Sequence, residues 1–234
     1  MSRVVVVTGG NRGIGADIAK AFADLGDKVV VFSRSGTAPD GIDAISCDVS
    51  STESVESAFD ELEEKFGVAE VVIANAGVTK DTLLMRMTDE DIENVINTNL
   101  IGAIRIARRS SKGMLKLRRG RIIFVGSVVA LLGSAGQVNY AASKSGLIGA
   151  ARSLAREVGA RGITANVIAP GFVDTDMTAV LTDDQKKSIV ASVPLGRYAS
   201  TSEISGVATF LASDAASYIT GAVIPVDGGL GMGH

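Results

Sequence analysis

The stretch that decides the fold is Val4-Val5-Val6-Val7-Thr8-Gly9-Gly10-Asn11-Arg12-Gly13-Ile14-Gly15, near the N-terminus. Its four valines predict a β-strand that is buried on both faces. The next residues predict a helix over Ile14–Leu25, because apolar side chains recur there at helical spacing as far as Gly26. A glycine-rich turn therefore joins a buried strand to the start of a helix. In such a turn, glycines let the backbone approach a pyrophosphate, and the N–H groups at the start of the helix face the anion.

The order of the glycines separates two kinds of nucleotide site. The pattern over Thr8–Gly15 is T-G-x-x-x-G-x-G, and the strict G-x-G-x-x-G fingerprint fails because Ile18 occupies the place of its last glycine. No Gly-Lys-Ser/Thr occurs, which excludes a P-loop. The alternative is a glycine-rich turn without a ligand, but its place between a strand and a helix favours a dinucleotide site. The residues expected to contact the dinucleotide here are Gly9, Asn11, Arg12, Gly13, Ile14 and Gly15.

Beyond this turn, short apolar runs alternate with amphipathic stretches along the whole chain. The predicted strands are Val4–Val7, Val29–Phe32, Ala44–Cys47, Val71–Ala74, Ile122–Val125, Thr164–Ile168 and Ala222–Val226. Predicted helices include Thr52–Phe66 and a long one from Asp89 to Leu117, which begins with a capping-box signal at Thr88. This alternation predicts an α/β fold, a doubly wound, Rossmann-type parallel sheet of about seven strands with helices on both faces. We expect one domain over residues 1–234.

The composition excludes several chemistries. The chain has 234 residues with a single histidine, His234, and a single cysteine, Cys47. A Ser-His-Asp or Cys-His triad needs a well-placed imidazole, and the only one is on the last residue. A zinc site of His and Cys lacks ligands, and no disulfide can form within the chain. We therefore expect no metal.

The same composition sets expectations for partners and location. No apolar run approaches the ~18 residues of a membrane span. The start, Met1-Ser2-Arg3, leads straight into a strand-like run without the shape of a signal peptide, so we expect a cytoplasmic protein. A net charge of -3 and 4% aromatic residues make a poor nucleic-acid binder.

The end of the second predicted strand indicates which dinucleotide fits. Sites for NAD usually place a carboxylate there, on the ribose 2′-hydroxyl. Here the strand ends Phe32-Ser33-Arg34, and Arg34 together with Arg12 would suit the 2′-phosphate of NADPH, which a carboxylate would repel. The alternative is two solvated arginines. Asp48, after the third strand, is expected near the adenine.

Four polar residues follow predicted strands or sit on predicted helices in a suggestive pattern. Tyr140 and Lys144 are four residues apart at the start of a helix, which places them on one face. Ser127 comes just after the fifth strand, and Asn99 lies in the long helix. Taken singly, each has an ordinary alternative role: Tyr140 as a surface aromatic of the helix, Ser127 as a cap at the strand end, and Asn99 as a buried structural amide. The segment Asn75-Ala76-Gly77 follows the fourth strand.

Taken together, these residues resemble the short-chain dehydrogenases/reductases. The matching motifs are the Thr8–Gly15 loop, Asp48, Asn75-Ala76-Gly77, Asn99, Ser127, Tyr140, Lys144 and Pro170-Gly171, and they cover essentially the whole chain. The resemblance implies catalysis by Asn99, Ser127, Tyr140 and Lys144. It also implies cofactor contacts from Arg34, Asp48, Val49, Asn75, Ala76, Gly77, Tyr140, Lys144, Pro170, Gly171, Val173 and Thr175.

The implied chemistry is the reduction of a ketone. A free tyrosine has a pKa of about 10, and a nearby ammonium from Lys144 should lower the pKa of Tyr140. Ser127 would hydrogen-bond the carbonyl oxygen of the substrate. By resemblance, Lys144 also binds the nicotinamide ribose, and Asn99 holds a water that refills the proton relay.

Longer stretches resemble one branch of that family, the 3-oxoacyl-[acyl-carrier-protein] reductases of fatty-acid synthesis, above all the actinobacterial type. They include Leu84-Met85-Arg86-Met87-Thr88, the run from Asn139 to Lys144, and Asp227-Gly228-Gly229 with the residues after it. The resemblance implies NADPH as cofactor, a (3R)-3-hydroxyacyl product and a homotetramer. Two alternatives remain open, a reductase of 3-oxoacyl-CoA and a dinucleotide-binding regulator without activity.

A group of basic residues suggests how an acidic carrier protein could bind. The group is Lys112, Lys116, Arg118, Arg119, Arg121 and Arg161. We expect these residues to lie together near the mouth of the active site and to steer the carrier, with Arg118 and Arg161 as contacts by resemblance. The alternative is that cations at the end of the long helix only stabilise its dipole.

The segment Phe172–Leu195 is the expected lid of the site. Its apolar side chains, Phe172, Val173, Met177, Val180 and Leu181, could line an acyl channel or could equally form the core of the lid.

Overall fold

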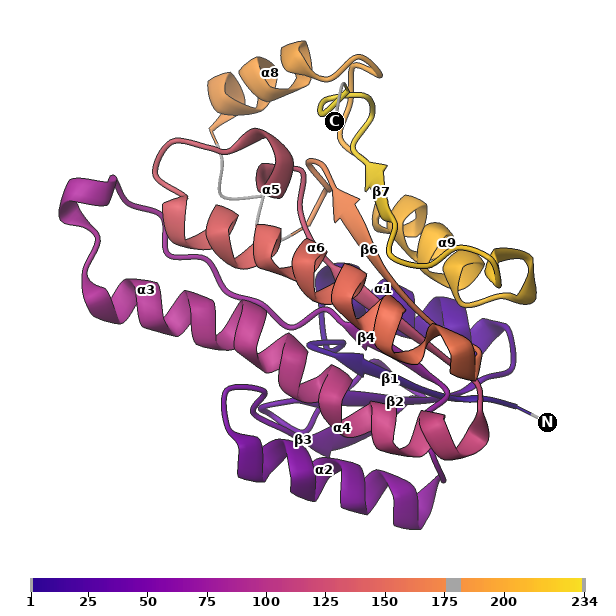
Figure 1. Cartoon of the computed structure of the whole chain (residues 1–234). Helices are drawn as coiled ribbons and strands as arrows, with labels where there is room; N and C mark the ends of the chain where they lie inside the picture. The colour runs from indigo at the N-terminus through magenta and orange to yellow at the C-terminus, as the bar shows by residue number, and fades with distance from the viewer. Residues whose placement is uncertain (1, 176–181, 233–234) are drawn as a thin grey trace.

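The apolar runs predicted from the sequence form the strands of one parallel sheet in the computed structural model, which describes residues 2–175 and 182–232. The strands, labelled as in Figure 1, are β1 (Val4–Thr8), β2 (Lys28–Ser33), β3 (Asp43–Ser46), β4 (Val71–Ala74), β5 (Gly120–Val125), β6 (Ile163–Pro170) and β7 (Val223–Val226). Their order is β3-β2-β1-β4-β5-β6-β7, and every neighbouring pair is parallel. The predicted fold is confirmed.

Helices cover both faces of this sheet (Figure 1). They are α1 (Gly13–Asp24), α2 (Thr52–Lys65), α3 (Asp89–Ile96), α4 (Gly102–Leu117), α5 (Val129–Leu132), α6 (Val138–Val158), α8 (Asp183–Ser192) and α9 (Thr201–Leu211). On one face α1 and α9 bury Ile18, Phe22, Ile204 and Leu211. On the other face α2, α4 and α6 bury Phe59, Leu62, Ile106, Met114 and Leu147.

The first strand shows why its sequence has no polar alternation. Val5 and Val7 belong to the core under α1 and α9, whereas Val4 and Val6 belong to the core under α2 and α4. Because successive side chains of a strand point to opposite faces, a strand covered on both faces must be apolar throughout.

One predicted element differs from the structure. The long helix expected from Asp89 to Leu117 consists of α3 and α4 joined by a π-helical turn, Asn97–Ile101. A π turn inserts one extra residue into a helix and is frequent at functional sites, but it leaves the apolar periodicity on either side almost unchanged. Its start is as predicted, since Thr88 and Asp91 form the capping box.

The carboxyl ends of the strands meet at one edge of the sheet. Strand order reverses beside β1, because the chain pairs β1 with β2 on one side and with β4 on the other. Open α/β sheets bind ligands outside the carboxyl ends of strands at such a switch point. The glycine-rich turn after β1 and the Asn75-Ala76-Gly77 segment after β4 lie at this place.

Candidate active site

The glycine-rich turn is fastened to the end of β4 by side-chain hydrogen bonds. Asn75 donates from Nδ2 to the carbonyl oxygens of Thr8 and Gly9, at 3.0 and 3.2 Å. The Thr8 hydroxyl accepts hydrogen bonds from the backbone N–H groups of Asn75 and Ala76, both at 3.0 Å. A Cβ on Gly15 would lie 2.5 Å from both Asn75 Nδ2 and the Gly9 oxygen, so only glycine fits there. The turn is therefore held in one shape.

The start of α1 is left open to an anion. Its N-cap residue, Arg12, makes no side-chain capping bond, and no acidic residue lies in the first turn. Gly13 has φ +54°, a conformation that favours glycine. The partial positive charge of the helix start is thus not neutralised by the chain, which suits a phosphate group.

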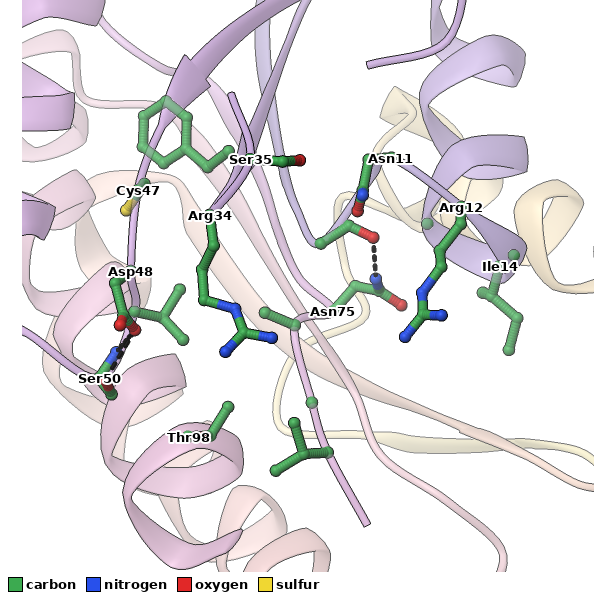
Figure 2. A pocket seen from close by; sticks show the side chains of 18 of the residues that line it. Asn11, Arg12, Ile14, Arg34, Ser35, Cys47, Asp48, Ser50, Asn75 and Thr98 are labelled. Carbon is green, nitrogen blue, oxygen red and sulfur yellow. Dashed lines mark hydrogen bonds between the residues drawn. The ribbon is translucent and has the colours of Figure 1, made fainter. Parts of the chain in front are cut away.

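A cleft of about 820 Å³ opens in front of this turn. Most of the predicted cofactor contacts line it: Gly9, Asn11, Arg12, Gly13, Ile14, Gly15, Arg34, Asp48, Val49, Asn75, Ala76, Gly77 and Thr175. Figure 2 shows the arginines from the glycine-rich turn and from the end of β2 reaching into it from different walls. The cleft therefore unites the segments after β1, β2, β3 and β4.

Other lining residues were missed by the sequence. Phe32 and Ser35 flank Arg34, and Cys47 and Ser50 flank Asp48, so adjacency to a predicted contact was the available signal. Val78 is likewise adjacent to a predicted contact, Gly77. The other two missed residues, Asn94 and Thr98, are adjacent to no predicted cofactor contact except that Thr98 precedes the predicted catalytic Asn99. They come from α3 and the π turn, whose wall position depends on how the helix packs.

The charges around Asp48 favour its ionised form. Hydrogen bonds from the Ser50 hydroxyl (2.6 Å) and backbone N–H (2.9 Å) reach Asp48 Oδ1. The hydroxyl bond is the largest cause that lowers the pKa of Asp48, and the charges of Arg34 and Arg105 lower it further. This wall of the cleft thus carries one carboxylate among cationic side chains.

Tyr140 and Lys144 both lie near the start of α6, as predicted. Lys144 is 4% exposed and donates from Nζ to the Val125 carbonyl oxygen at 2.7 Å. The same Nζ lies 5.7 Å from the centroid of the Tyr140 ring. Burial lowers the pKa of Lys144 to about 8. Among the described residues no carboxylate offsets that burial, so the ammonium loses its proton more readily than an exposed lysine.

The expected effect of Lys144 on Tyr140 is wrong for this structure. The sequence predicted a lowered pKa for Tyr140, but its pKa is raised. Burial of the phenol is the largest cause, the Asp81 carboxylate adds to it, and only the interaction with the Ser127 hydroxyl acts in the opposite direction. Desolvation of the phenolate thus sets the direction of the shift, and the phenol stays protonated at neutral pH.

Asn99 lies on the π turn and is 1% exposed. Its Oδ1 accepts a hydrogen bond from the Val78 N–H at 2.8 Å, and its Nδ2 donates to the Val78 carbonyl at 3.0 Å and to the Ser143 hydroxyl at 3.1 Å. A Cβ on Gly77 would lie 3.3 Å from Asn99 Oδ1 and 3.5 Å from Lys144 Nζ. The structure therefore brings Asn99 and Lys144 together beside a residue that lines the cleft.

Ser127 follows β5 on a segment tied to the end of β6. The backbone N–H groups of Gly126 and Val128 donate to the carbonyls of Ile168 (2.7 Å) and Pro170 (2.8 Å). Ser127 Oγ accepts a hydrogen bond from the Val129 N–H at 3.2 Å. Its hydroxyl also interacts with Tyr140, so these two predicted catalytic residues are neighbours.

Besides Tyr140 and Lys144, three predicted cofactor contacts lie apart from the lining of the cleft. Pro170 ends β6, and Gly171 packs so tightly on β7 that a Cβ would lie 2.7 Å from the Asp227 Cα. Val173 is 4% exposed and packs in the core beneath α9. Of the segment after β6, Thr175 is the described residue that lines the cleft.

The expected lid is only partly described. Phe172 stacks on Tyr198 with ring centroids 6.0 Å apart, and it lines a second cavity of about 440 Å³ with Leu195 and Met232. Met177, Val180 and Leu181, which were expected to line an acyl channel, lie outside the described residues.

The basic residues lie at the amino edge of the sheet, where the strands begin. The sequence had predicted them at the carboxyl edge, where the strands end. Arg118 follows the end of α4, and Arg161 directly precedes Gly162 and β6. A Cβ on Gly162 would lie 2.8 Å from the Arg118 oxygen, so the two segments touch as predicted. However, α4 runs away from the catalytic edge (Figure 1), and its sixteen residues span about 24 Å. The prediction that these residues flank the mouth of their own active site is wrong.

Two features are absent from the described part of the chain. Within residues 2–175 and 182–232, no helix is long and apolar enough to cross a membrane. In that same part of the chain, no group of three His, Cys, Asp or Glu side chains could hold a metal ion.

The chain is similar to well-described proteins over its full length. A family model described as enoyl-(acyl carrier protein) reductase matches residues 9–231. The 3-oxoacyl-[acyl-carrier-protein] reductase of Mycobacterium tuberculosis strain H37Rv is 51% identical over 234 residues, which cover 100% of this chain and 95% of that protein. The enzyme of the same description from Escherichia coli K12 is 46% identical, with 98% of each chain covered.

A solved structure supports the same relationship. It is a proposed gluconate dehydrogenase from Agrobacterium tumefaciens, with a TM-score of 0.92, 31% identity, and coverage of 99% of this chain and 97% of that one. Sequence and structural similarity thus extend over the whole sheet and its site. The chain belongs to the short-chain dehydrogenase/reductase family, whose members are oxidoreductases that use a nicotinamide dinucleotide.

Proposed function

We propose that this chain reduces 3-oxoacyl-[acyl-carrier-protein] to the (3R)-3-hydroxyacyl form with NADPH, as a step of fatty-acid synthesis. The observation that carries the proposal is the position of Gly77. It lines the dinucleotide cleft, and a Cβ there would touch both Asn99 Oδ1 and Lys144 Nζ. A bound dinucleotide would therefore lie beside Asn99 and Lys144, with the Tyr140 ring centroid 5.7 Å from Lys144 Nζ and Ser127 next to Tyr140. The 46–51% identical relatives named as 3-oxoacyl-[acyl-carrier-protein] reductases support the substrate class.

The residues of the cleft fit a nicotinamide dinucleotide. The glycine-rich turn offers the uncapped start of α1 to the pyrophosphate, and Gly9 and Gly15 let this turn pack closely on Asn75 and Ala76. Arg12 and Arg34 would bind the 2′-phosphate that distinguishes NADPH, and β2 ends in Ser33-Arg34 without the carboxylate typical of NAD sites. Asp48 and Val49 would lie against the adenine.

The proposed mechanism divides one reduction between cofactor and chain. The nicotinamide supplies a hydride when bound. Tyr140 donates the proton to the carbonyl oxygen, and its raised pKa keeps the phenol protonated for that role. Ser127, the neighbour of Tyr140, would hold the same oxygen by a hydrogen bond. Lys144 would bind the ribose and Asn99 a water that returns a proton to Tyr140.

We also propose that the carrier docks on Arg118 and Arg161 in a homotetramer. Because α4 spans about 24 Å and these residues lie at the edge away from their own site, they would serve the site of another copy. Antiparallel packing of α4 against α4 would bring one copy's basic end to the other's catalytic edge. Ile101 and Ile104 support such packing, since they are 41% and 43% exposed at the start of the helix. Within each copy, we propose that residues 1–234 form a single domain.

One assay tests the proposed activity against its alternatives. Loss of NADPH absorbance is followed with acetoacetyl thioesters of acyl carrier protein and of CoA, and with the matching 2-enoyl thioesters, which test the reaction named by the family model. We expect turnover of the 3-oxoacyl carrier thioester above all. A preference for CoA would make the chain a 3-oxoacyl-CoA reductase, turnover of the enoyl thioesters alone would make it an enoyl reductase, and no turnover would leave a dinucleotide-binding regulator.

A further inference from the structure

The π turn Asn97–Ile101 contacts both halves of the site. On one side, Thr98 lines the dinucleotide cleft and Asn97 donates from Nδ2 to the Ser50 carbonyl of the β3–α2 loop at 3.5 Å. On the other side, Asn99 holds the backbone of Val78 and the hydroxyl of Ser143. A π turn is a rare helical geometry that occurs as a single turn. Contacts from outside the helix therefore decide its exact position.

Arg105, in the first turn of α4, makes further contacts from outside the π turn. Its Nη1 donates to Asn97 Oδ1 at 2.8 Å and to the Val49 carbonyl at 3.3 Å. Its Nε donates to the Thr52 hydroxyl at 3.0 Å. One planar guanidinium thus joins three points: the π turn, the cleft wall and the start of α2.

Close packing supports the same connection. Gly102 follows the π turn directly, and a Cβ there would lie 2.9 Å from Val49 Cγ2 and 3.0 Å from the Val49 carbonyl oxygen. The π turn and the cleft wall are therefore in contact, with no room for a side chain between them. A displacement of Val49 would push on the backbone that carries Asn99.

We propose that Arg105 is a positioning residue that fixes Asn99 to the dinucleotide-binding wall. Its hydrogen bonds connect the Asp48–Thr52 loop rigidly to the π turn. The wall that would hold the adenine of the dinucleotide therefore also sets the position of Asn99. The inference concerns positions within the chain, and it rests on the proposed function only for the catalytic meaning of Asn99.

Hydrogen exchange at Val78 reads out the position of Asn99 without any cofactor. The Val78 N–H donates to Asn99 Oδ1 at 2.8 Å, so its exchange speeds up when Asn99 moves. In the chain without ligand, Arg105→Met should accelerate this exchange about tenfold, a coupling typical of residues in one hydrogen-bond network. Arg105→Gln, which can still reach one of the three acceptors, should fall between wild type and Arg105→Met.

Turnover at saturating NADPH gives the second readout. We expect Arg105→Met to lower kcat about tenfold at saturation, in addition to raising the Kd of NADPH measured by fluorescence. The matched control is Arg108→Met, an exposed arginine on the same helix, which should behave as wild type in all three measurements.

The outcomes separate this inference from the proposed function. Unchanged Val78 exchange in Arg105→Met, with only a weaker affinity for NADPH, would overturn it, because Arg105 would then support the cleft wall alone. Equal acceleration in Arg108→Met would also overturn it, since the effect would be a general loosening of α4. If the wild type turns over no thioester, the proposed function fails, and the exchange comparison still decides the role of Arg105.

Discussion

The two edges of the sheet differ in what their polar side chains do. At the carboxyl edge, polar groups are buried and hold the backbone: Asn75 binds the glycine-rich turn, and Asn99 binds Val78. At the amino edge, cations lie at the surface, and Arg119 forms an ion pair with Glu70. Buried, hydrogen-bonded groups fix geometry, whereas exposed charges mainly attract and orient partners. The comparison predicts that substitutions at the carboxyl edge reduce turnover, whereas substitutions at the amino edge reduce affinity for a partner.

The largest effect is expected at Lys144 on the carboxyl edge. Lys144→Met should lower kcat by about 10³-fold, because the proton-relay side chain and its charge are both removed. The chain should still fold, and circular dichroism with NADPH fluorescence checks this. A variant with wild-type kcat would break the assignment of the carboxyl edge as the catalytic one.

The same variant has a pH signature. The folded-state pKa of Lys144 is lowered from 10.5 to about 8, so between these values the unfolded chain binds more protons than the folded one. Stability should therefore gain from this group as pH rises from about 8 to 10.5. Urea unfolding over that range should show a flatter pH dependence for Lys144→Met than for wild type. Parallel curves would contradict the burial of a titrating lysine.

The next effect concerns the cofactor wall. Arg34→Glu should lower kcat/KM for NADPH about 100-fold, since a carboxylate would face the 2′-phosphate. The value for NADH should change little, and NADH serves as the internal control. Equal losses with both cofactors would show that Arg34 supports the shape of the cleft and does not select the phosphate.

A smaller effect is expected at the amino edge. Arg118→Glu combined with Arg161→Glu should raise KM for the carrier-linked substrate about tenfold and leave the CoA substrate unchanged. Lys20→Glu combined with Lys65→Glu, two exposed lysines elsewhere, controls for net charge. An equal loss with the CoA substrate would refute docking at this edge.

The sequence was informative at the carboxyl edge for a physical reason. Glycine turns and strand ends are local features, so the loop over Gly9–Gly15 and the segment after β4 could be placed without knowing the packing. The π turn could not be found, because one inserted residue hardly alters helical periodicity. Arg105 was missed for a different reason, because its role depends on a loop that is distant in sequence.

The prediction for the basic residues was wrong for a different reason. Their proximity to each other was predictable, because Arg118 and Arg161 precede neighbouring parallel strands. Their edge was also predictable, since a helix between parallel strands runs from the carboxyl edge to the amino edge. The resemblance assigned these residues a partner, but the length of α4, about 24 Å, separates its basic end from the catalytic edge.

The smallest effect concerns charge beside Tyr140. The Asp81 carboxylate raises the pKa of Tyr140, and Asp81 also accepts a hydrogen bond from Gln137 at 2.7 Å. Asp81→Asn keeps an acceptor for Gln137 and removes the charge, so the phenol should lose its proton at lower pH. The alkaline decline of kcat should therefore move to lower pH, and a pH–rate profile against wild type checks the direction. A shift to higher pH would contradict the electrostatic account.

The central claim is that Tyr140 at the carboxyl edge delivers the proton to a ketone. The direct test is Tyr140→Phe, which removes one hydroxyl from a side chain that packs near Ser127 and Lys144. NADPH affinity is measured by fluorescence, and turnover is measured with acetoacetyl-[acyl-carrier-protein]. The account predicts NADPH binding within about twofold of wild type and a loss of kcat of at least about 100-fold. Retained turnover with intact NADPH binding would contradict it.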